Sequence, residues 1–170
     1  MTTQDQLLQV PVAPTFHVVE AEASAASEAM MTWQNAGLRV KVLRGRKMRV
    51  TPRLMDEVAA ALQFPHYFGE NWAALDECLS DMEWFLPSLG IVVVVRDADA
   101  VLADEPSEEL EALVTAMRKA SMAYAKPIED GEWWDRPALP FHVVLQVAPE
   151  LFDKATRRWT GAGAATAPLK

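Results

Sequence analysis

The chain has 170 residues, 51% of them apolar and 24% charged, which is the balance of a globular protein and excludes a wholly disordered chain. Cys78 is the single cysteine, so an intramolecular disulfide and a cysteine-based metal cage are excluded. No run of about 18 apolar residues predicts a membrane span, and the first residues lack the features of a secretory signal. We therefore expect a cytoplasmic protein with no membrane contact.

The net charge of −8 is distributed unevenly. Between positions 70 and 111 the only basic residue is Arg96, against twelve acids: Glu70, Asp76, Glu77, Asp81, Glu83, Asp97, Asp99, Asp104, Glu105, Glu108, Glu109 and Glu111. Such a surface repels nucleic acid and attracts a cationic partner, so we expect no direct nucleic-acid binding. A solvated face that serves only solubility remains the alternative.

The N-terminal third predicts a leader and one β-α unit. Residues 1–14, interrupted by two prolines, predict a disordered leader. Residues 15–20 alternate as a short strand does, and residues 21–34 are rich in Ala and Met, as in a helix that stops near Gly37. We expect residues 15–37 to form an N-terminal β-α extension.

A strand, a turn and a helix are expected next. Residues 38–44 alternate apolar and basic side chains, which predicts a strand, and Gly45 predicts a turn. Residues 47–50 form a second short alternating piece. Thr51 and Pro52 predict a helix start, with the threonine hydroxyl as a cap. An amphipathic stripe then runs to Pro65 through Leu54, Met55, Val58, Ala59 and Leu62.

The remaining pattern alternates helices and strands. Helices are expected from Asn71 to Met82 and over 106–125, and strands at 91–95, which suits a strand covered on both faces, and at 141–146. Residues 149–170 predict a flexible tail. The expected fold is α/β: a small, mainly parallel sheet of three to four strands packed with helices, with its principal domain at 38–148.

Residues 64–79 carry the most informative motif. Pro65 ends one helix, Gly69 supplies a permissive turn and Asn71 can cap the next helix, so two helices meet at a tight corner. Ala73, Glu77 and Asp81 follow at i, i+4 and i+8, on the side away from a Trp72–Leu75–Leu79 stripe. An aromatic corner beside carboxylates suits binding to a cationic cleft.

These residues closely resemble the barstar family of ribonuclease inhibitors. The resemblance comprises the corner (Pro65, Tyr67, Phe68, Gly69, Asn71), the helix after it (Ala74, Leu75, Glu77, Cys78, Leu79), and the order of elements over 38–146. The loop at 126–140 looks longer than the family usually has.

The resemblance implies a protein that is no enzyme and needs no cofactor or metal. It implies a monomer that blocks the active site of a basic secreted ribonuclease, or a related nuclease toxin, in a one-to-one complex, with acids mimicking RNA phosphates. Glu77 matches the dominant acid, where the family has aspartate; Ala73 and Asp76 replace a family acid and a tryptophan, and Arg118-Lys119 replace a late acid. The expected contact residues are Tyr67, Phe68, Gly69, Asn71, Trp72, Ala73, Asp76, Glu77 and Asp81.

Two other functions stay open. Asp97 and Asp99 leave the end of an apolar strand, where two carboxylates can hold magnesium for a phosphohydrolase, although strand-end aspartates are common turn residues. A non-inhibitory module that docks to another basic protein is the second, with Trp133 and Trp134 as docking residues unless they cap the sheet. Cys78 is expected to be a buried small hydrophobe.

Overall fold

A computed structural model describes Leu8, Pro11 and residues 15–169 of the chain. The expected disordered leader at 1–14 thus lies outside the described residues except at these two positions, and Leu8 is fully buried. Among the described helices, none has the length and apolar character needed to cross a membrane.

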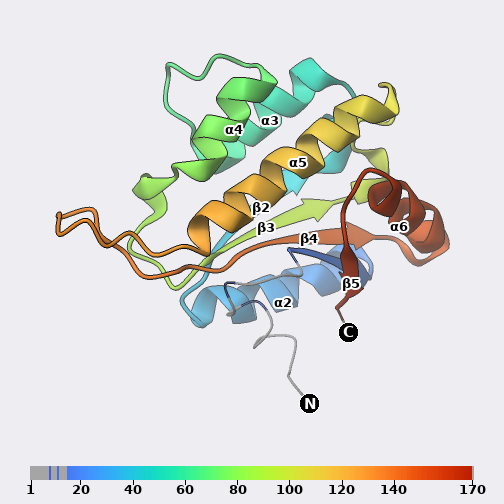
Figure 1. The fold of residues 1–170 in the computed structure, drawn as a ribbon. Coiled ribbons are helices and arrows are strands. Elements are labelled where there is room, and N and C mark those ends of the chain that lie inside the picture. Colours follow the sequence, from blue (N-terminus) through green and yellow to red (C-terminus); the bar gives the residue numbers. More distant parts are fainter. Residues whose placement is uncertain (1–7, 9–10, 12–14, 170) are drawn as a thin grey trace.

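Five parallel strands form one sheet in the order β2-β3-β4-β1-β5 (Figure 1). The strands are β1 (Phe16–Glu20), β2 (Arg39–Arg44), β3 (Ile91–Arg96), β4 (Phe141–Val147) and β5 (Thr166–Pro168). The α/β class and the parallel sheet are confirmed, but the expected three to four strands are too few. The N-terminal strand β1 lies inside the sheet, between β4 and β5, rather than as an addition at its edge.

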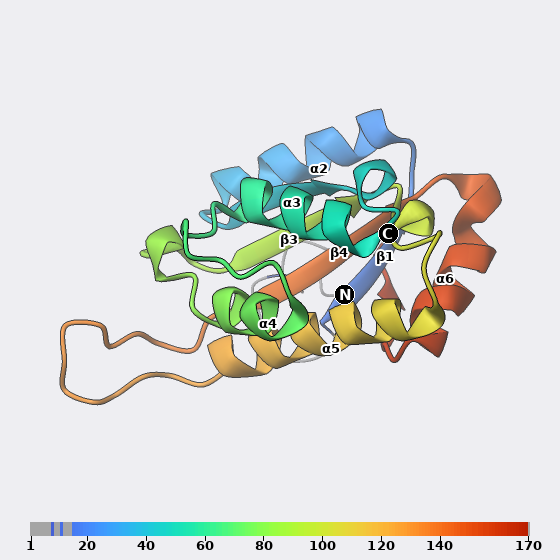
Figure 2. The ribbon, with the colours of Figure 1, turned by 90° about the horizontal axis from the view of Figure 1, so that it is seen from above.

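Helices cover both faces of the sheet (Figures 1 and 2). On one face lies α2 (Ala23–Asn35), and on the other lie α3 (Thr51–Leu62), α4 (Trp72–Ser80) and α5 (Ser107–Tyr124). The final helix is α6 (Phe152–Gly161). Short 3-10 helices are η1 (Gly45–Lys47), η2 (Glu83–Phe85), η3 (Ala98–Ala100) and η4 (Pro149–Leu151).

The strand β3 shows why the chain adopts two layers of helix. Its odd positions, from Ile91 to Val95, lie in the large core beneath α3, α4 and α5, whereas Val92 and Val94 lie in a smaller core beneath α2 that includes Trp33. A pleated strand places alternate side chains on opposite faces, so a continuous apolar run needs cover on both. The sequence-based expectation for this strand is confirmed.

The expectation of a flexible tail at 149–170 is wrong. Between residues 149 and 168 the chain forms η4, α6 and β5, and β5 pairs with β1. Within α6, Ala155 and Trp159 are buried, and the indole N–H of Trp159 donates a hydrogen bond to the Ala98 carbonyl oxygen at 3.0 Å. One buried tryptophan fastens an otherwise polar helix, which composition did not reveal.

The expected strand piece at 47–50 is also wrong. Gly45 opens the 3-10 turn η1, and the Met48 N–H bonds to the Gly45 carbonyl oxygen at 2.9 Å. A Cβ at Gly45 would lie 2.2 Å from the backbone oxygen of Asp97, so only glycine allows this close approach to the chain that leaves β3. The turn expected at Gly45 is confirmed.

Candidate partner-binding site

The corner between α3 and α4 is held by its own hydrogen bonds. The Phe68 N–H donates to the Pro65 carbonyl oxygen at 3.0 Å. Asn71 stands at the N-cap of α4: its Oδ1 accepts the Ala74 N–H at 2.9 Å, and its Nδ2 donates to the Gly69 carbonyl oxygen at 3.0 Å. The predicted cap is therefore confirmed, and it fixes the direction in which α4 leaves the corner.

Gly69 has a different role from the one expected. The left-handed backbone conformation falls on Glu70, with φ 52°, and not on Gly69. A Cβ at Gly69 would lie 3.2 Å from Asn71 Nδ2 and 3.4 Å from the Ala74 Cβ. Gly69 thus provides clearance for the Asn71 cap rather than an unusual turn conformation.

The corner aromatics point in different directions. Tyr67 is 73% exposed, whereas Phe68 is half-buried and contacts Phe64 with ring centroids 5.0 Å apart. Of these expected contact residues, Tyr67 is the one available to a partner. The phenol of Tyr67 therefore forms the outer surface of the corner.

Trp72 joins three helices at the start of α4. Its indole N–H donates to Glu109 Oε2 at 2.9 Å, and the same oxygen accepts the Thr51 hydroxyl at 2.8 Å. Val50, not Thr51, is the N-cap of α3, so the expected threonine cap is wrong: Glu109 of α5 binds that hydroxyl instead. Trp72 is half-buried and positions α4.

The outward side of α4 carries unpaired carboxylates. Ala73, Glu77 and Asp81 are all exposed, as their spacing predicts. Within the described part of the chain, neither Glu77 nor Asp81 has a hydrogen bond or an ion pair to its side chain. We call Tyr67, Ala73, Glu77 and Asp81 the acidic face.

The opposite side of α4 is buried and holds the only cysteine. Leu75, Cys78 and Leu79 lie in contact with the protein interior. Burial, followed by the charges of Glu77 and Asp81, raises the pKa of the Cys78 thiol. The thiol is therefore protonated at neutral pH, and the buried Cys78 side chain packs as a small apolar group, as expected.

Asp76 does not add its charge to the acidic face. Its Oδ2 accepts the Lys119 ammonium of α5 at 3.2 Å. This ion pair lies at a hollow between α4 and α5 of about 370 Å³, which Trp72, Ala73 and Thr115 also line. The expected contact residue Asp76 is therefore neutralised from within the chain.

Tyr124 was not found from the sequence, although it holds the end of α4. Its hydroxyl accepts the Met82 N–H at 2.7 Å and donates to the Leu79 carbonyl oxygen at 3.1 Å. Burial raises the pKa of Tyr124 to about 12. A tyrosine on the apolar stripe of α5 was the available signal, because a buried phenol needs a hydrogen-bond partner.

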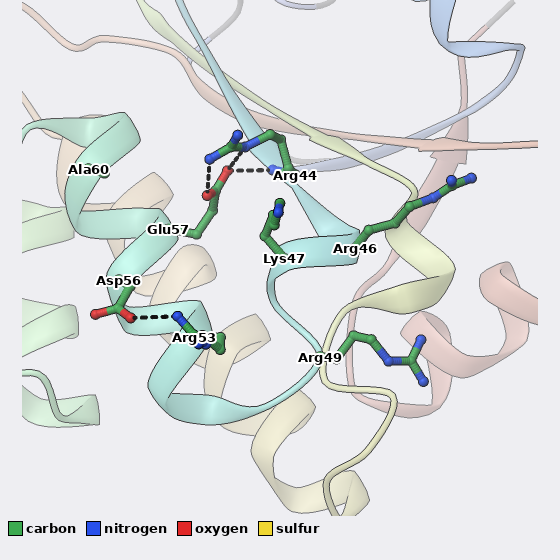
Figure 3. A pocket seen from close by; sticks show the side chains of 8 residues that line it. All are labelled: Arg44, Arg46, Lys47, Arg49, Arg53, Asp56, Glu57 and Ala60. Carbon is green, nitrogen blue, oxygen red and sulfur yellow. Dashed lines mark hydrogen bonds and ion pairs between the residues drawn. The ribbon is translucent and has the colours of Figure 1, made fainter.

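A basic hollow of about 650 Å³ lies at the carboxyl end of the edge strand β2 (Figure 3). Residues 39–53 include seven basic side chains and no acid, and five of these side chains line the basic hollow: Arg44, Arg46, Lys47, Arg49 and Arg53. Arg44, however, forms a bidentate ion pair with the buried Glu57 of α3, with both N–O distances at 2.7 Å. Glu57 Oε1 also accepts the Arg44 backbone N–H at 3.0 Å.

Other cations of this basic hollow are also paired. Arg49 binds Asp104 through two 2.7 Å hydrogen bonds, and Arg46 lies 3.2 Å from Asp97. In Figure 3 the side chains of Arg46 and Arg49 extend away from Glu57. Much of the positive charge is thereby balanced by the chain's own carboxylates.

The strand-end aspartates are surrounded by cations. Asp97 is paired with Arg46, and Asp99 lies close enough to Arg49 and Arg158 to act on the pKa of each guanidinium. No group of three or more His, Cys, Asp or Glu in the described residues is arranged to hold a metal. The β1–α2 connection is Ala21-Glu22, without the glycines and lysine of a phosphate-binding loop.

Solved structures resemble this chain at low sequence identity. Cdc6p from Pyrobaculum aerophilum is 11% identical, with a TM-score of 0.52, over 91% of this chain and 38% of that one. The Drosophila ORC bound to AT-rich DNA and Cdc6 is 10% identical over 91% of this chain and 48% of that one, with a TM-score of 0.48. This chain thus spans under half of these structures, and at such identity the first likeness shows the fold alone.

A search of curated proteins found no match. The family model described as Barstar (barnase inhibitor) matches residues 38–146, which run from the start of β2 through most of β4 and include the corner, α4 and α5. The resemblance to the barstar family is thereby confirmed over more than half of the sequence, and the chain belongs to that family.

Proposed function

We propose that this protein inhibits a basic ribonuclease, or a related nuclease toxin, by inserting the acidic face of α4 into its active-site cleft. The observation that carries the proposal is that Glu77 and Asp81 are exposed without internal partners, near the exposed Tyr67 of the corner. Asn71 and Tyr124 fix the two ends of α4, which carries Glu77 and leads into Asp81. The match to a family described by barnase inhibition supports the same role.

The chemistry of the acidic face suits imitation of an RNA backbone. Unpaired carboxylates accept charge-assisted hydrogen bonds from Arg and Lys, as phosphate oxygens do. Glu77 occupies the position of the dominant acid, and Tyr67 supplies an aromatic surface that excludes water beside it. The acids at 70–111 increase the rate of encounter with a basic cleft, an effect that salt weakens.

Two departures from the family pattern favour a cognate enzyme other than barnase. Ala73 stands where the family has an acid, and Arg118-Lys119 stand where it has a late acid, with Lys119 also bound to Asp76. The acidic face therefore presents fewer free carboxylates than the family pattern implies. A partner with a correspondingly less basic, or differently spaced, cleft fits better.

The proposal includes a one-to-one complex formed in the cytoplasm. A cell that secretes a ribonuclease needs to silence molecules of it that remain inside. The reduced, buried Cys78 is compatible with such a compartment.

Inhibition assays test the proposal. Barnase and the basic ribonucleases that the source organism secretes are titrated separately with the protein, and hydrolysis of a fluorogenic RNA is followed. We expect stoichiometric inhibition of at least one enzyme. No change in any of them at a tenfold molar excess would overturn the proposal and leave a non-inhibitory docking module as the alternative.

Glu77→Ala then tests the residue that matters most. We expect the Kd for the inhibited enzyme to rise about 30-fold or more, or about 2 kcal/mol, because cations of the enzyme stay buried and unpaired. That magnitude is the one for interface hot spots in general, for which barnase and barstar are themselves a reference case. Glu28→Ala, an exposed acid of α2, is the matched control and should change the Kd less than twofold.

A further inference from the structure

The loop between α5 and β4 is held by its own hydrogen bonds and carries two exposed tryptophans. Trp133 is 85% exposed and Trp134 is 44% exposed, and their rings meet edge to face with centroids 5.4 Å apart. The possibility that the pair caps the sheet does not agree with this exposure. Large exposed aromatic surface is unfavourable in water and marks interaction sites.

Specific hydrogen bonds hold the tip of this loop. Both oxygens of the Asp135 carboxylate accept backbone N–H groups, from Asp130 at 3.0 Å and from Gly131 at 2.9 Å. An antiparallel bridge joins Ile128 and Arg136 at its base. The tryptophans therefore project from an ordered hairpin, which lowers the entropy that a partner must remove on binding.

Arg136 clamps the loop to the end of α5. Its guanidinium donates to the carbonyl oxygens of Ala123 at 3.3 Å and Lys126 at 2.9 Å, and it lies 5.1 Å from the ring centroid of Tyr124. The same Tyr124 holds the C-terminal end of α4. One tyrosine thus links the placement of the loop to that of the acidic face.

The tryptophans line a hollow that begins where α4 ends. Its volume is about 510 Å³, and Leu86, Pro87 and Leu139 contribute apolar surface to it. Glu83 and residues 86–88 form one wall, and this segment follows Asp81 after the single residue Met82. Figure 2 shows the loop extending past the ends of α4 and α5, on the side toward which α4 runs.

The rim of this hollow is acidic. Glu83 and Asp135 line it, and the loop also carries Glu129, Asp130 and Glu132. The one basic side chain that lines the hollow, Arg136, donates hydrogen bonds to carbonyl oxygens, and the loop's other basic residue, Lys126, lies at its base next to α5. Tryptophan faces beside carboxylates attract Arg and Lys side chains, through cation–π contact and charge together.

We propose that the Trp133–Trp134 loop is a second docking surface for the same basic nuclease, taking an Arg or Lys side chain of that enzyme outside its active site. This inference rests on the proposed function and extends the contact area beyond the acidic face. The aliphatic stem of the basic side chain packs on the tryptophans and the apolar hollow, while Glu83 binds its charged end.

Calorimetric titration of the double variant Trp133→Ala/Trp134→Ala tests the inference against barnase and the source organism's secreted basic ribonucleases. We expect at least a tenfold rise in the Kd of the enzyme that Glu77→Ala also weakens, with an unchanged melting temperature of the free variant. Met31→Ala, which removes a side chain 63% exposed on α2, is the control and should leave the Kd unchanged.

A second variant, Glu83→Gln, removes the charge at the rim without removing packing, and should slow association at low salt. A Kd that depends on Glu77 but changes less than twofold in the double tryptophan variant overturns the loop inference alone. Absence of binding to every ribonuclease tested overturns the proposed function, and the loop inference with it.

Discussion

The acidic face of α4 and the basic hollow at β2 are both dense in charge, yet they differ in how that charge is used. Glu77 and Asp81 are exposed without internal partners, whereas Arg44 and Arg49 are each bound bidentately by a carboxylate of the same chain. Charge that is already paired contributes little to recognition of a partner, because binding would first have to break the pair. The number of charges in a segment therefore does not decide which segment recognises a partner.

The largest effect on stability should come from the ion pairs of the basic hollow, and it should differ between them. Glu57→Gln is expected to lower the free energy of unfolding by about 2 kcal/mol, because Glu57 is buried and accepts three hydrogen bonds from Arg44. Urea unfolding measures this. Asp104→Asn, which breaks an equally short pair at the surface, should leave the urea midpoint almost unchanged.

The pH dependence sharpens the same contrast. The side-chain hydrogen bond from Arg44 holds the pKa of Glu57 below its ordinary value of 4.5. Its stabilising contribution is present above that value and is lost as the pH falls toward the lowered pKa of the folded state. Between wild type and Glu57→Gln, the difference in unfolding free energy should therefore shrink in acid; a constant difference would contradict this account.

A somewhat smaller effect is expected from the residue that holds the acidic face in place. Tyr124→Phe should lower the free energy of unfolding by about 1–2 kcal/mol at neutral pH, because the buried Met82 N–H loses its acceptor. Chemical denaturation gives this value. The Kd for the partner should also rise, since the end of α4 is no longer fixed.

Alkaline pH separates this role from simple packing. Because the pKa of Tyr124 is raised to about 12, the unfolded chain ionises this phenol near pH 10 while the folded chain keeps it protonated. The unfolding free energy should fall from pH 10 to pH 12 by at most roughly 1.4 kcal/mol per unit. Tyr124→Phe should lack this part of the slope, and an identical slope in both proteins would refute the assignment.

The smallest effect is expected from breaking the ion pair between Lys119 and Asp76. Lys119→Ala releases Asp76 and makes the acidic face more negative. We expect association with the proposed basic partner to become a few-fold faster at low salt, with only a small change in stability, because the Lys119 side chain that is removed is 60% exposed. Stopped-flow kinetics at two salt concentrations measure this, and a slower association would argue against electrostatic steering.

Much of the fold could be predicted because local patterns carry it. The apolar stripe of α3, the β-branched run of β3 and the cap at Asn71 each act over a few residues. The helix α6 could not be predicted in this way. Its buried contacts involve Trp159 and a carbonyl oxygen at Ala98, 61 residues away, while its other positions are mostly polar.

The candidate site shows the same division. The exposure of Glu77 follows from its spacing along α4, and is correctly predicted. Pairing of Asp76 with Lys119 spans 43 residues, and the hold of Tyr124 on Met82 spans 42. No periodicity within one helix reports such contacts, so the sequence alone overestimated the free acids of α4 and missed the tyrosine that fixes it.

The amino-acid sequence by itself determined the α/β class, the parallel strands, the corner at 65–71 and the side of α4 that faces water, because periodicity and capping depend on neighbouring residues. Only the tertiary structure decided that β1 lies within a five-stranded sheet, that residues 149–168 belong to the fold, and which carboxylates remain unpaired. Those outcomes depend on contacts between side chains of different elements, and local sequence patterns do not report which distant residues come into contact.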